Sequence, residues 1–272
     1  MRLLTKIIIP LILTGILTSC GDSDKRNGYM TDSTIKDDLI LLQNKKIFFG
    51  HQSVGNNILQ GLKEIISKHN DIKLNIIQPQ SANTQPEGFF AEAMIGQNTM
   101  PETKLRDFDQ KIGSYFNGDL DLALMKFCYV DINAETNVEA LFDIYKSAYE
   151  SLKTKYPKIK FVHVTVPLTE RPRGVKHFIK TLLGREKSAY MENFKRNVFN
   201  EFIKQTYGTE PIFDLAGVES TYPDGSRETL EIEGRIFYAL ISDYTNDGGH
   251  LNETGGRLAA EGLIKTLSAA VR

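Results

Sequence analysis

Residues 45–55 read KKIFFGHQSVG, and this short stretch decides the fold class. Its first part, residues 45–50, is a brief apolar run that is typical of a buried strand. Apolar side chains then recur at helical spacing from Val54 to Ile66. A strand that passes directly into a helix is the first half of a β-α unit. Because parallel strands need long crossover connections, which are usually helices, this unit predicts a parallel sheet.

The same alternation continues along the chain. Four further strands are predicted at residues 72–77, 120–130, 159–166 and 211–215, and four further helices at residues 105–116, 138–156, 188–207 and 254–271. Residues 78–101 are rich in Asn, Gln, Pro and Gly, so we expect a long loop there. Five β-α units in series predict an α/β fold with three layers, in which helices cover both faces of a five-stranded parallel sheet.

The composition is that of an ordinary globular protein. The chain has 272 residues, of which 41% are hydrophobic and 25% charged, and this excludes a disordered chain. Its 33 Lys and Arg residues against 34 Asp and Glu residues give a net charge of −1, whereas nucleic-acid binders usually carry a basic excess. No zinc-ligand spacing and no phosphate-binding glycine motif occurs in the sequence. We therefore expect a small-molecule or glycan substrate, no nucleic-acid partner, no metal and no cofactor.

The amino terminus has the layout of a secretory signal. Arg2 and Lys6 precede an apolar run over residues 7–17, which is too short to span a membrane as a helix. Leu17-Thr18-Ser19-Cys20 then resembles the lipobox of bacterial lipoproteins, in which the chain is cut before the cysteine and the thiol is acylated. The alternative is an ordinary signal peptide that is cut at small residues.

The lipoprotein interpretation divides the chain into three parts. We expect a signal peptide at residues 1–19, the lipidated Cys20 with a polar tether over residues 20–38, and one folded domain over residues 39–272. The acyl chains would make the membrane a partner of the protein. This interpretation predicts a location in the bacterial cell envelope.

Ser53 lies at the first strand-to-helix junction, near the amino end of the predicted helix. Free backbone N–H groups and the helix dipole favour negative charge at such a position. An attacking serine there would have an anion-stabilising amide beside it. The alternative interpretation of this junction alone is a serine that caps the helix.

A second polar motif, Asp247-Gly248-Gly249-His250, stands directly before the last predicted helix. A serine nucleophile needs a base, and the base needs an anionic partner that fixes its tautomer. Asp247 and His250 are three residues apart in a glycine-containing loop that could turn both side chains toward one site. The alternative is an Asx-turn followed by a surface histidine.

Together, Gly50-His51-Gln52-Ser53 and Asp247-Gly248-Gly249-His250 resemble the first and last motifs of the SGNH or GDSL hydrolase superfamily. The resemblance covers about residues 45–272. It implies a flavodoxin-like sheet, with Ser53 as the nucleophile, His250 as general base and then acid, and Asp247 as the carboxylate that orients the histidine. The aspartate that usually precedes the serine is replaced here by His51-Gln52.

The resemblance also implies an oxyanion hole, to which the N–H of Ser53 would contribute. Gly96, in Ile95-Gly96-Gln97-Asn98, is the candidate for the glycine N–H that family members usually add. Residues 126–133 read KFCYVDIN and lack the usual Gly-x-Asn-Asp motif. Asn98 from another loop, or the charge of Lys126, would then take the place of the missing asparagine.

These residues predict a serine esterase that cleaves an acyl ester through a covalent acyl-enzyme. An acetyl group on a glycan or another cell-envelope ester is a plausible substrate for an enzyme in that location. The alternative, from another functional class, is a non-catalytic lipoprotein that keeps the hydrolase architecture and uses the site to hold a glycan.

Overall fold

The computed structural model describes residues 32–79, 86–171, 186–232 and 234–272. The predicted signal peptide at residues 1–19 and the predicted lipidation site at Cys20 lie outside this part of the chain. Within the described part, no helix combines the length and the apolar character that crossing a membrane requires.

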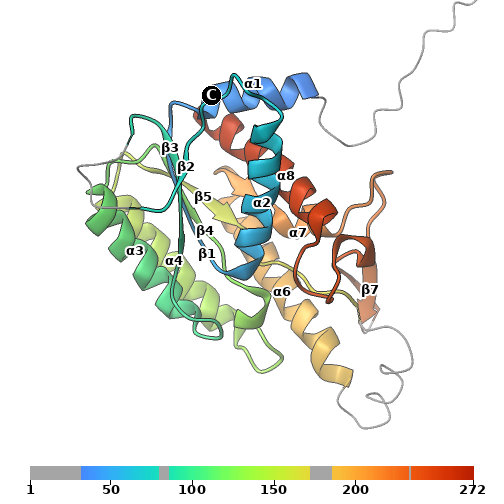
Figure 1. Ribbon diagram of the computed structural model, residues 1–272. Helices are drawn as coiled ribbons and strands as arrows, with labels where there is room; N and C mark the ends of the chain where they lie inside the picture. Colours follow the sequence, from blue (N-terminus) through green and yellow to red (C-terminus); the bar gives the residue numbers. More distant parts are fainter. Residues whose placement is uncertain (1–31, 80–85, 172–185, 233) are drawn as a thin grey trace, which may run out of the picture.

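A six-stranded parallel sheet forms the centre of the domain, with the strand order β2-β3-β1-β4-β5-β6 (Figure 1). Its strands are β1 (Lys46–His51), β2 (Ile76–Ile77), β3 (Phe89–Met94), β4 (Leu122–Met125), β5 (Lys160–Val164) and β6 (Ile212–Phe213). The central strand β4 is buried along its whole length, as expected for a strand that helices cover on both faces. The predicted α/β architecture is confirmed.

The strand β3 corrects the prediction of a loop over residues 78–101 and of a five-stranded sheet. Phe89–Met94 pairs in parallel with both β1 and β2 and is the sixth strand. Glu92 interrupts the apolar pattern of this segment, but its carboxylate meets the buried His51 ring, with 3.0 Å between Oε2 and Nε2. An antiparallel hairpin of β7 (Thr229–Ile232) and β8 (Arg235–Tyr238), which the apolar pattern does not predict either, stands apart from this sheet.

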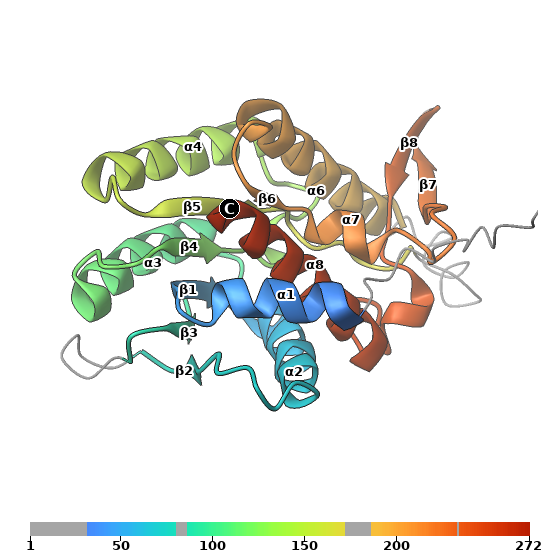
Figure 2. The same cartoon turned by 90° about the horizontal axis from the view of Figure 1, so that it is seen from above.

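Helices cover both faces of the sheet and bury two separate apolar clusters (Figure 2). One face carries α1 (Asp32–Leu42), α2 (Ser53–Ser67), α7 (Leu215–Glu219) and α8 (Glu253–Val271). The opposite face carries α3 (Pro101–Phe116), α4 (Val138–Lys155) and α6 (Glu186–Tyr207). The three layers that the sequence predicts are therefore present.

Helix α1 corrects the extent of the predicted tether, because residues 32–38 belong to the folded domain. Ile35 and Leu39 are buried in the core against α8. Asp38 accepts a hydrogen bond from the terminal Arg272 at 2.5 Å. Only every third or fourth residue of such an amphipathic helix is buried, so its polar composition resembles that of a solvated tether.

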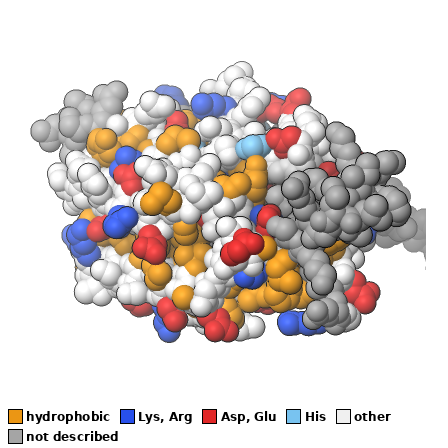
Figure 3. Space-filling view, turned by 90° about the horizontal axis from the view of Figure 1, so that it is seen from below, with side chains coloured by type: hydrophobic (Ala, Val, Ile, Leu, Met, Phe, Trp, Pro, Cys, Tyr) orange, Lys and Arg blue, Asp and Glu red, His pale blue; other side chains and the backbone are white. Residues whose placement is uncertain are grey.

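The carboxyl ends of the strands meet at one edge of the sheet, the lower edge in Figure 1. Ser53 follows β1 there, residues 95–100 follow β3, and residues 126–131 follow β4. Figure 3 looks onto this edge and shows hydrophobic side chains along its middle, with acidic groups and a histidine around them. In parallel α/β sheets, functional groups collect at this edge.

Candidate active site

Ser53, His250 and Asp247 form a continuous hydrogen-bonded chain. The Oγ of Ser53 lies 3.0 Å from Nε2 of His250, although 197 positions separate the two residues. The Nδ1 of His250 lies 2.7 Å from Oδ2 of Asp247. Because a carboxylate only accepts hydrogen bonds, Nδ1 carries the proton and Nε2 is left to accept from the serine hydroxyl. In this arrangement the histidine can take a proton from Ser53.

The turn between β1 and α2 aims Ser53 at the histidine. Gln52 is the N-cap residue, with extended backbone angles of −135° and −161°, and Ser53 is the first residue of α2. Ser53 is therefore not the helix cap, which was the alternative interpretation of this junction. Its own N–H belongs to the first helical turn, where backbone donors have no carbonyl partner within the helix.

His51 and Gln52 tie this turn to the segment after β3. The His51 side chain is fully buried between Gln52, whose carbonyl oxygen lies 3.0 Å from Nδ1, and Glu92. The ring packs against Gly55, where an added Cβ would come within 2.4 Å of it. Gln52 donates from Nε2 to the carbonyl oxygens of Ile95 and Gly96 at 2.7 and 3.0 Å. The departure from the family motif thus places two anchoring side chains beside Ser53.

The loop that carries Asp247 and His250 is held by its own polar groups. Oδ1 of Asp247 accepts from the backbone N–H groups of Gly249 at 3.0 Å and of His250 at 2.8 Å, while Oδ2 faces the His250 ring. Thr245 donates from Oγ1 to the carbonyl oxygen of His250 at 2.6 Å. The Asx-turn and the aspartate-histidine pair, which the sequence offers as alternatives, are therefore both present.

The electrostatics of this pair favour an ionised Asp247. The hydrogen bond from His250 and the two backbone N–H donors hold the pKa of Asp247 well below its usual range. The side chains of His250 and Asp247 are 39% and 56% exposed. The pair thus carries the negative charge of Asp247 and is open to solvent at the edge of the sheet.

Tyr129, which the sequence motifs do not single out, packs beside His250. The two ring centroids lie 5.7 Å apart with an interplanar angle of 74°. Gly249 makes room for the phenol ring, since a Cβ there would lie 2.8 Å from Cζ of Tyr129. Burial and the charge of Asp247 raise the pKa of Tyr129. The buried Arg196 donates from Nε to the carbonyl oxygen of Tyr129 at 2.8 Å and fixes this turn to α6.

The structure corrects the predicted oxyanion role of Gly96. Its N–H donates to Oδ2 of Asp107 at 2.9 Å. Its φ of +51° and its close packing against the backbone of Lys104 explain why this position needs a glycine. Gly96 therefore allows α3 to pack closely against the loop. Its N–H is already bonded to the carboxylate of Asp107 and is not available to an oxyanion.

The two candidates for the third oxyanion position lie in different surroundings. Asn98 is exposed on the loop that Gln52 holds beside Ser53. Lys126 is fully buried, with Nζ 3.5 Å from Sγ of Cys128, and burial lowers the pKa of its amine. Of the two, Asn98 is the one that a substrate can reach.

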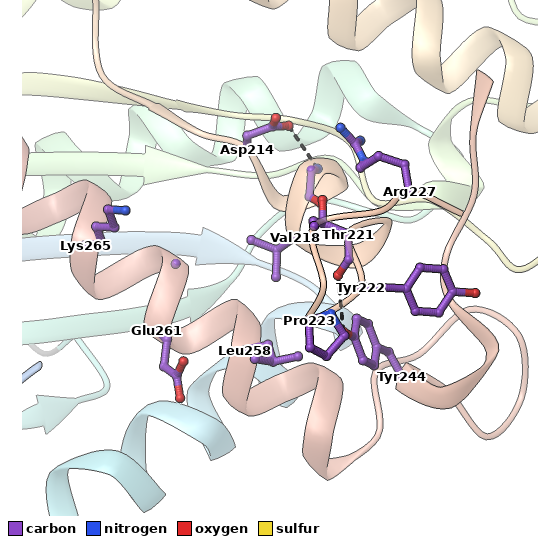
Figure 4. Close-up of a pocket in the computed structure, with 13 residues that line it drawn as sticks. Asp214, Val218, Thr221, Tyr222, Pro223, Arg227, Tyr244, Leu258, Glu261 and Lys265 are labelled. Atoms are coloured by element: carbon purple, nitrogen blue, oxygen red, sulfur yellow. Dashed lines mark hydrogen bonds between the residues drawn. The ribbon is translucent and has the colours of Figure 1, made fainter. Parts of the chain in front are cut away.

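A cavity of about 450 Å³ lies between α7, α8 and residues 221–227 (Figure 4). Tyr244, which lines this cavity, stands three residues before Asp247 in the chain. The cavity wall contains no member of the hydrogen-bonded chain; the lining side chains include Asp214, Val218, Tyr222, Arg227, Leu258 and Glu261. Among the described residues, no group of three His, Cys, Asp or Glu side chains could hold a metal ion.

No family model and no curated protein matches this sequence. Among solved structures, the chain is similar to a carbohydrate esterase family 3 protein from Talaromyces cellulolyticus, with a TM-score of 0.52 and 12% identity over 84% of this chain and 98% of that chain. It is also similar to a candidate platelet activating factor protein from Streptococcus pneumonia, with a TM-score of 0.50 and 13% identity over 89% and 92% of the two chains.

A candidate SGNH hydrolase from Slackia heliotrinireducens gives a TM-score of 0.48 and 17% identity over 81% of this chain and 97% of that chain. At these identities the likeness is one of fold. The chain thus shares its α/β fold with the carbohydrate esterase and with the candidate platelet activating factor protein.

Proposed function

We propose that this protein is a serine esterase that hydrolyses an acyl ester through an acyl-enzyme on Ser53. The observation that carries the proposal is the chain of hydrogen bonds from Ser53 Oγ to His250 Nε2 at 3.0 Å and from His250 Nδ1 to Asp247 at 2.7 Å. A serine, a base with a free acceptor nitrogen and a carboxylate that fixes its tautomer are the groups that nucleophilic acyl transfer needs.

The first half of the reaction forms the acyl-enzyme. Ser53 Oγ attacks the ester carbonyl carbon while its proton passes to Nε2 of His250. Asp247 stabilises the resulting imidazolium, and its depressed pKa keeps it ionised for this purpose. The bond from the carbonyl carbon to the alcohol oxygen then breaks, and the alcohol leaves with the proton from Nε2.

The second half releases the acid. Water occupies the place of the departed alcohol, gives one proton to Nε2 of His250 and attacks the acyl carbon. The bond to Ser53 Oγ breaks, the proton returns to the serine, and the carboxylic acid leaves. Both tetrahedral intermediates need donors for their oxyanion. The backbone N–H of Ser53 and the side-chain amide of Asn98 are the candidates for this role.

The openness of the site supports an ester carried on a larger scaffold. His250 and Asp247 are partly exposed at the sheet edge, so a bulky alcohol such as an acylated glycan can approach them from solvent. One structure with a similar fold is a carbohydrate esterase. We propose an acetyl group on a glycan of the cell envelope as the substrate, with the protein anchored to the membrane through acylated Cys20.

Ester hydrolysis by the full chain, purified in detergent, tests this function. Wild type should release acid from p-nitrophenyl acetate and from an acetylated polysaccharide at least ~10³ times faster than Ser53→Ala, because the nucleophile is lost. Ser67→Ala, at the far end of α2, is the matched control and should match wild type, since its hydroxyl bonds only the carbonyl oxygen of Glu64. Equal rates for wild type and Ser53→Ala on every ester would contradict the assignment.

A further inference from the structure

Side chains accept hydrogen bonds from most of the backbone N–H groups in the middle of the loop after β3. Three of the four N–H groups of residues 96–99 donate to side chains: Gly96 to Asp107 at 2.9 Å, Gln97 to Thr103 at 2.8 Å, and Thr99 to Asp131 at 2.8 Å. Within the described chain, the N–H of Asn98 has no such acceptor. Among the described residues, three N–H groups of this segment thus have side-chain acceptors and that of Asn98 has none.

A buried ion pair lies directly under this loop. Nζ of Lys104 meets Oδ2 of Asp131 at 2.5 Å, and both side chains are 0% exposed. The Asp131 carboxylate also accepts from the N–H groups of Thr99 and Cys128, at 2.8 and 2.7 Å. It thus joins α3, the loop after β3 and the turn after β4.

Such a pair is a weak source of stability, because removing two charges from water offsets most of their attraction. Apolar side chains of similar size often serve a core equally well. The value of this pair therefore lies in the geometry that it imposes on the groups around it.

Lys104 also determines which way the Asn98 side chain faces. Its Nζ lies 3.0 Å from Oδ1 of Asn98. An ammonium group only donates hydrogen bonds, so the amide oxygen must face Lys104 and the amide NH₂ group must face away from it. Asn98 is exposed, and Gln52 holds its loop against the Ser53 turn. The NH₂ group thus lies at the surface, on the loop that Gln52 ties to the turn that carries Ser53.

We propose that the Lys104-Asp131 ion pair positions the carboxamide of Asn98 as an oxyanion donor of this site. The inference rests on the proposed function of Ser53 and deepens it. Lys104 and Asp131 act through Asn98 and are positioning residues. The carboxamide of Asn98 would take the role that the resemblance gives to the asparagine of the missing Gly-x-Asn-Asp motif.

Asn98→Asp tests the donor itself. Aspartate keeps an oxygen toward Lys104 but has no NH₂ group, so kcat for p-nitrophenyl acetate should fall ~10- to 10³-fold, with KM and the melting temperature close to those of wild type. An unchanged kcat for Asn98→Asp, together with an inactive Ser53→Ala, would overturn this inference and leave the esterase assignment standing. An active Ser53→Ala would instead overturn the esterase assignment.

A double-mutant cycle between Lys104→Met and Asn98→Ala tests the positioning role. Lys104→Met alone should lower kcat to about the level of Asn98→Ala, and the double variant should lose no more than Asn98→Ala alone. Lys153→Met is the control, because Lys153 pairs with Glu210 directly before β6, at the opposite edge of the sheet. Any loss in this control should multiply with that of Asn98→Ala.

Losses of Lys104→Met and Asn98→Ala that multiply would contradict a shared role. If Lys104→Met does not fold, Asp131→Asn replaces it in the cycle, since its amide oxygen can still accept from Thr99. The same non-additivity with Asn98→Ala is expected, and full additivity would again overturn the proposal.

Discussion

The edge of the sheet carries two sets of polar groups that are built in opposite ways. Ser53, His250 and Asp247 are joined side chain to side chain, and the last two are 39% and 56% exposed. Lys104 and Asp131, beneath the neighbouring loop, are 0% exposed, and the Asp131 carboxylate accepts from the backbone N–H groups of Thr99 and Cys128. Groups that react must be reached by substrate, whereas groups that only fix a loop gain strength from burial in a low dielectric.

Asp247→Asn tests the exposed set and should give the largest effect of the three changes that follow. The amide keeps the size of the carboxylate but can neither fix the tautomer of His250 as firmly nor stabilise its positive charge. We expect kcat/KM to fall by ~10² to 10⁴-fold. Steady-state ester hydrolysis measures this loss, and a variant with wild-type kcat/KM would remove Asp247 from the mechanism.

The same variant has a defined pH signature. Because the pKa of Asp247 is held below its usual value, the aspartate-histidine pair stabilises the fold above about pH 4, and this contribution is lost as the pH falls through the folded-state pKa. The stability difference between wild type and Asp247→Asn should therefore shrink in acid, which chemical denaturation at several pH values measures.

Gly55→Ala tests the packing beneath Ser53. A Cβ at this position would meet the fully buried His51 ring at 2.4 Å, so the helix or the ring must shift, at a cost of about 1–3 kcal/mol of unfolding free energy. Gly113→Ala in α3 is the control, because its nearest neighbour is Tyr156 Oη at 3.1 Å. Urea unfolding should show a clear loss only for Gly55→Ala, and equal stabilities would contradict the packing described for His51.

Glu219→Gln tests another buried carboxyl group, through the pH dependence of stability. Oε2 of Glu219 accepts from the N–H of Leu168 at 2.7 Å, and burial raises the pKa of this carboxyl to about 8. Between its usual pKa and pH 8 the folded protein thus holds a proton that the unfolded chain has lost. Wild-type stability should fall as the pH rises through this window, by at most ~1.4 kcal/mol per pH unit.

The glutamine variant keeps an acceptor for Leu168 but has no proton to lose. Its stability relative to wild type should therefore rise between pH 5 and pH 8 in urea unfolding. Parallel pH profiles for the two proteins would show that Glu219 does not titrate in the folded state as described.

The exposed set is readable from the sequence because its signals are local. Ser53 stands where an apolar run passes into helical spacing, and Asp247 and His250 share one short glycine-containing motif. The order of strands and helices follows from apolar periodicity in the same way. The strand β3 is not predicted because Glu92 and its alanine neighbours interrupt the apolar pattern. The helix α1 is not predicted because polar residues dominate its composition.

The buried set is not readable, because it depends on packing between distant segments. Lys104 follows the polar residues Glu102 and Thr103 at the start of α3, and its contacts with Gly96, Asn98 and Asp131 bury it. Gly96 itself is misassigned from the motif because the direction of its N–H depends on a φ of +51°. The partners of Asp131 come from three segments that only the folded chain brings together.

The most direct test of the central claim is intact-mass analysis of the protein after reaction with a fluorophosphonate. Attack by Ser53 Oγ on phosphorus forms an O–P bond and releases fluoride, so wild type should gain one phosphonyl group that maps to Ser53. Ser53→Ala should gain none, and Asp247→Asn should react more slowly. Labelling of Ser53→Ala at the wild-type rate, or a label that maps to another residue, would contradict the account.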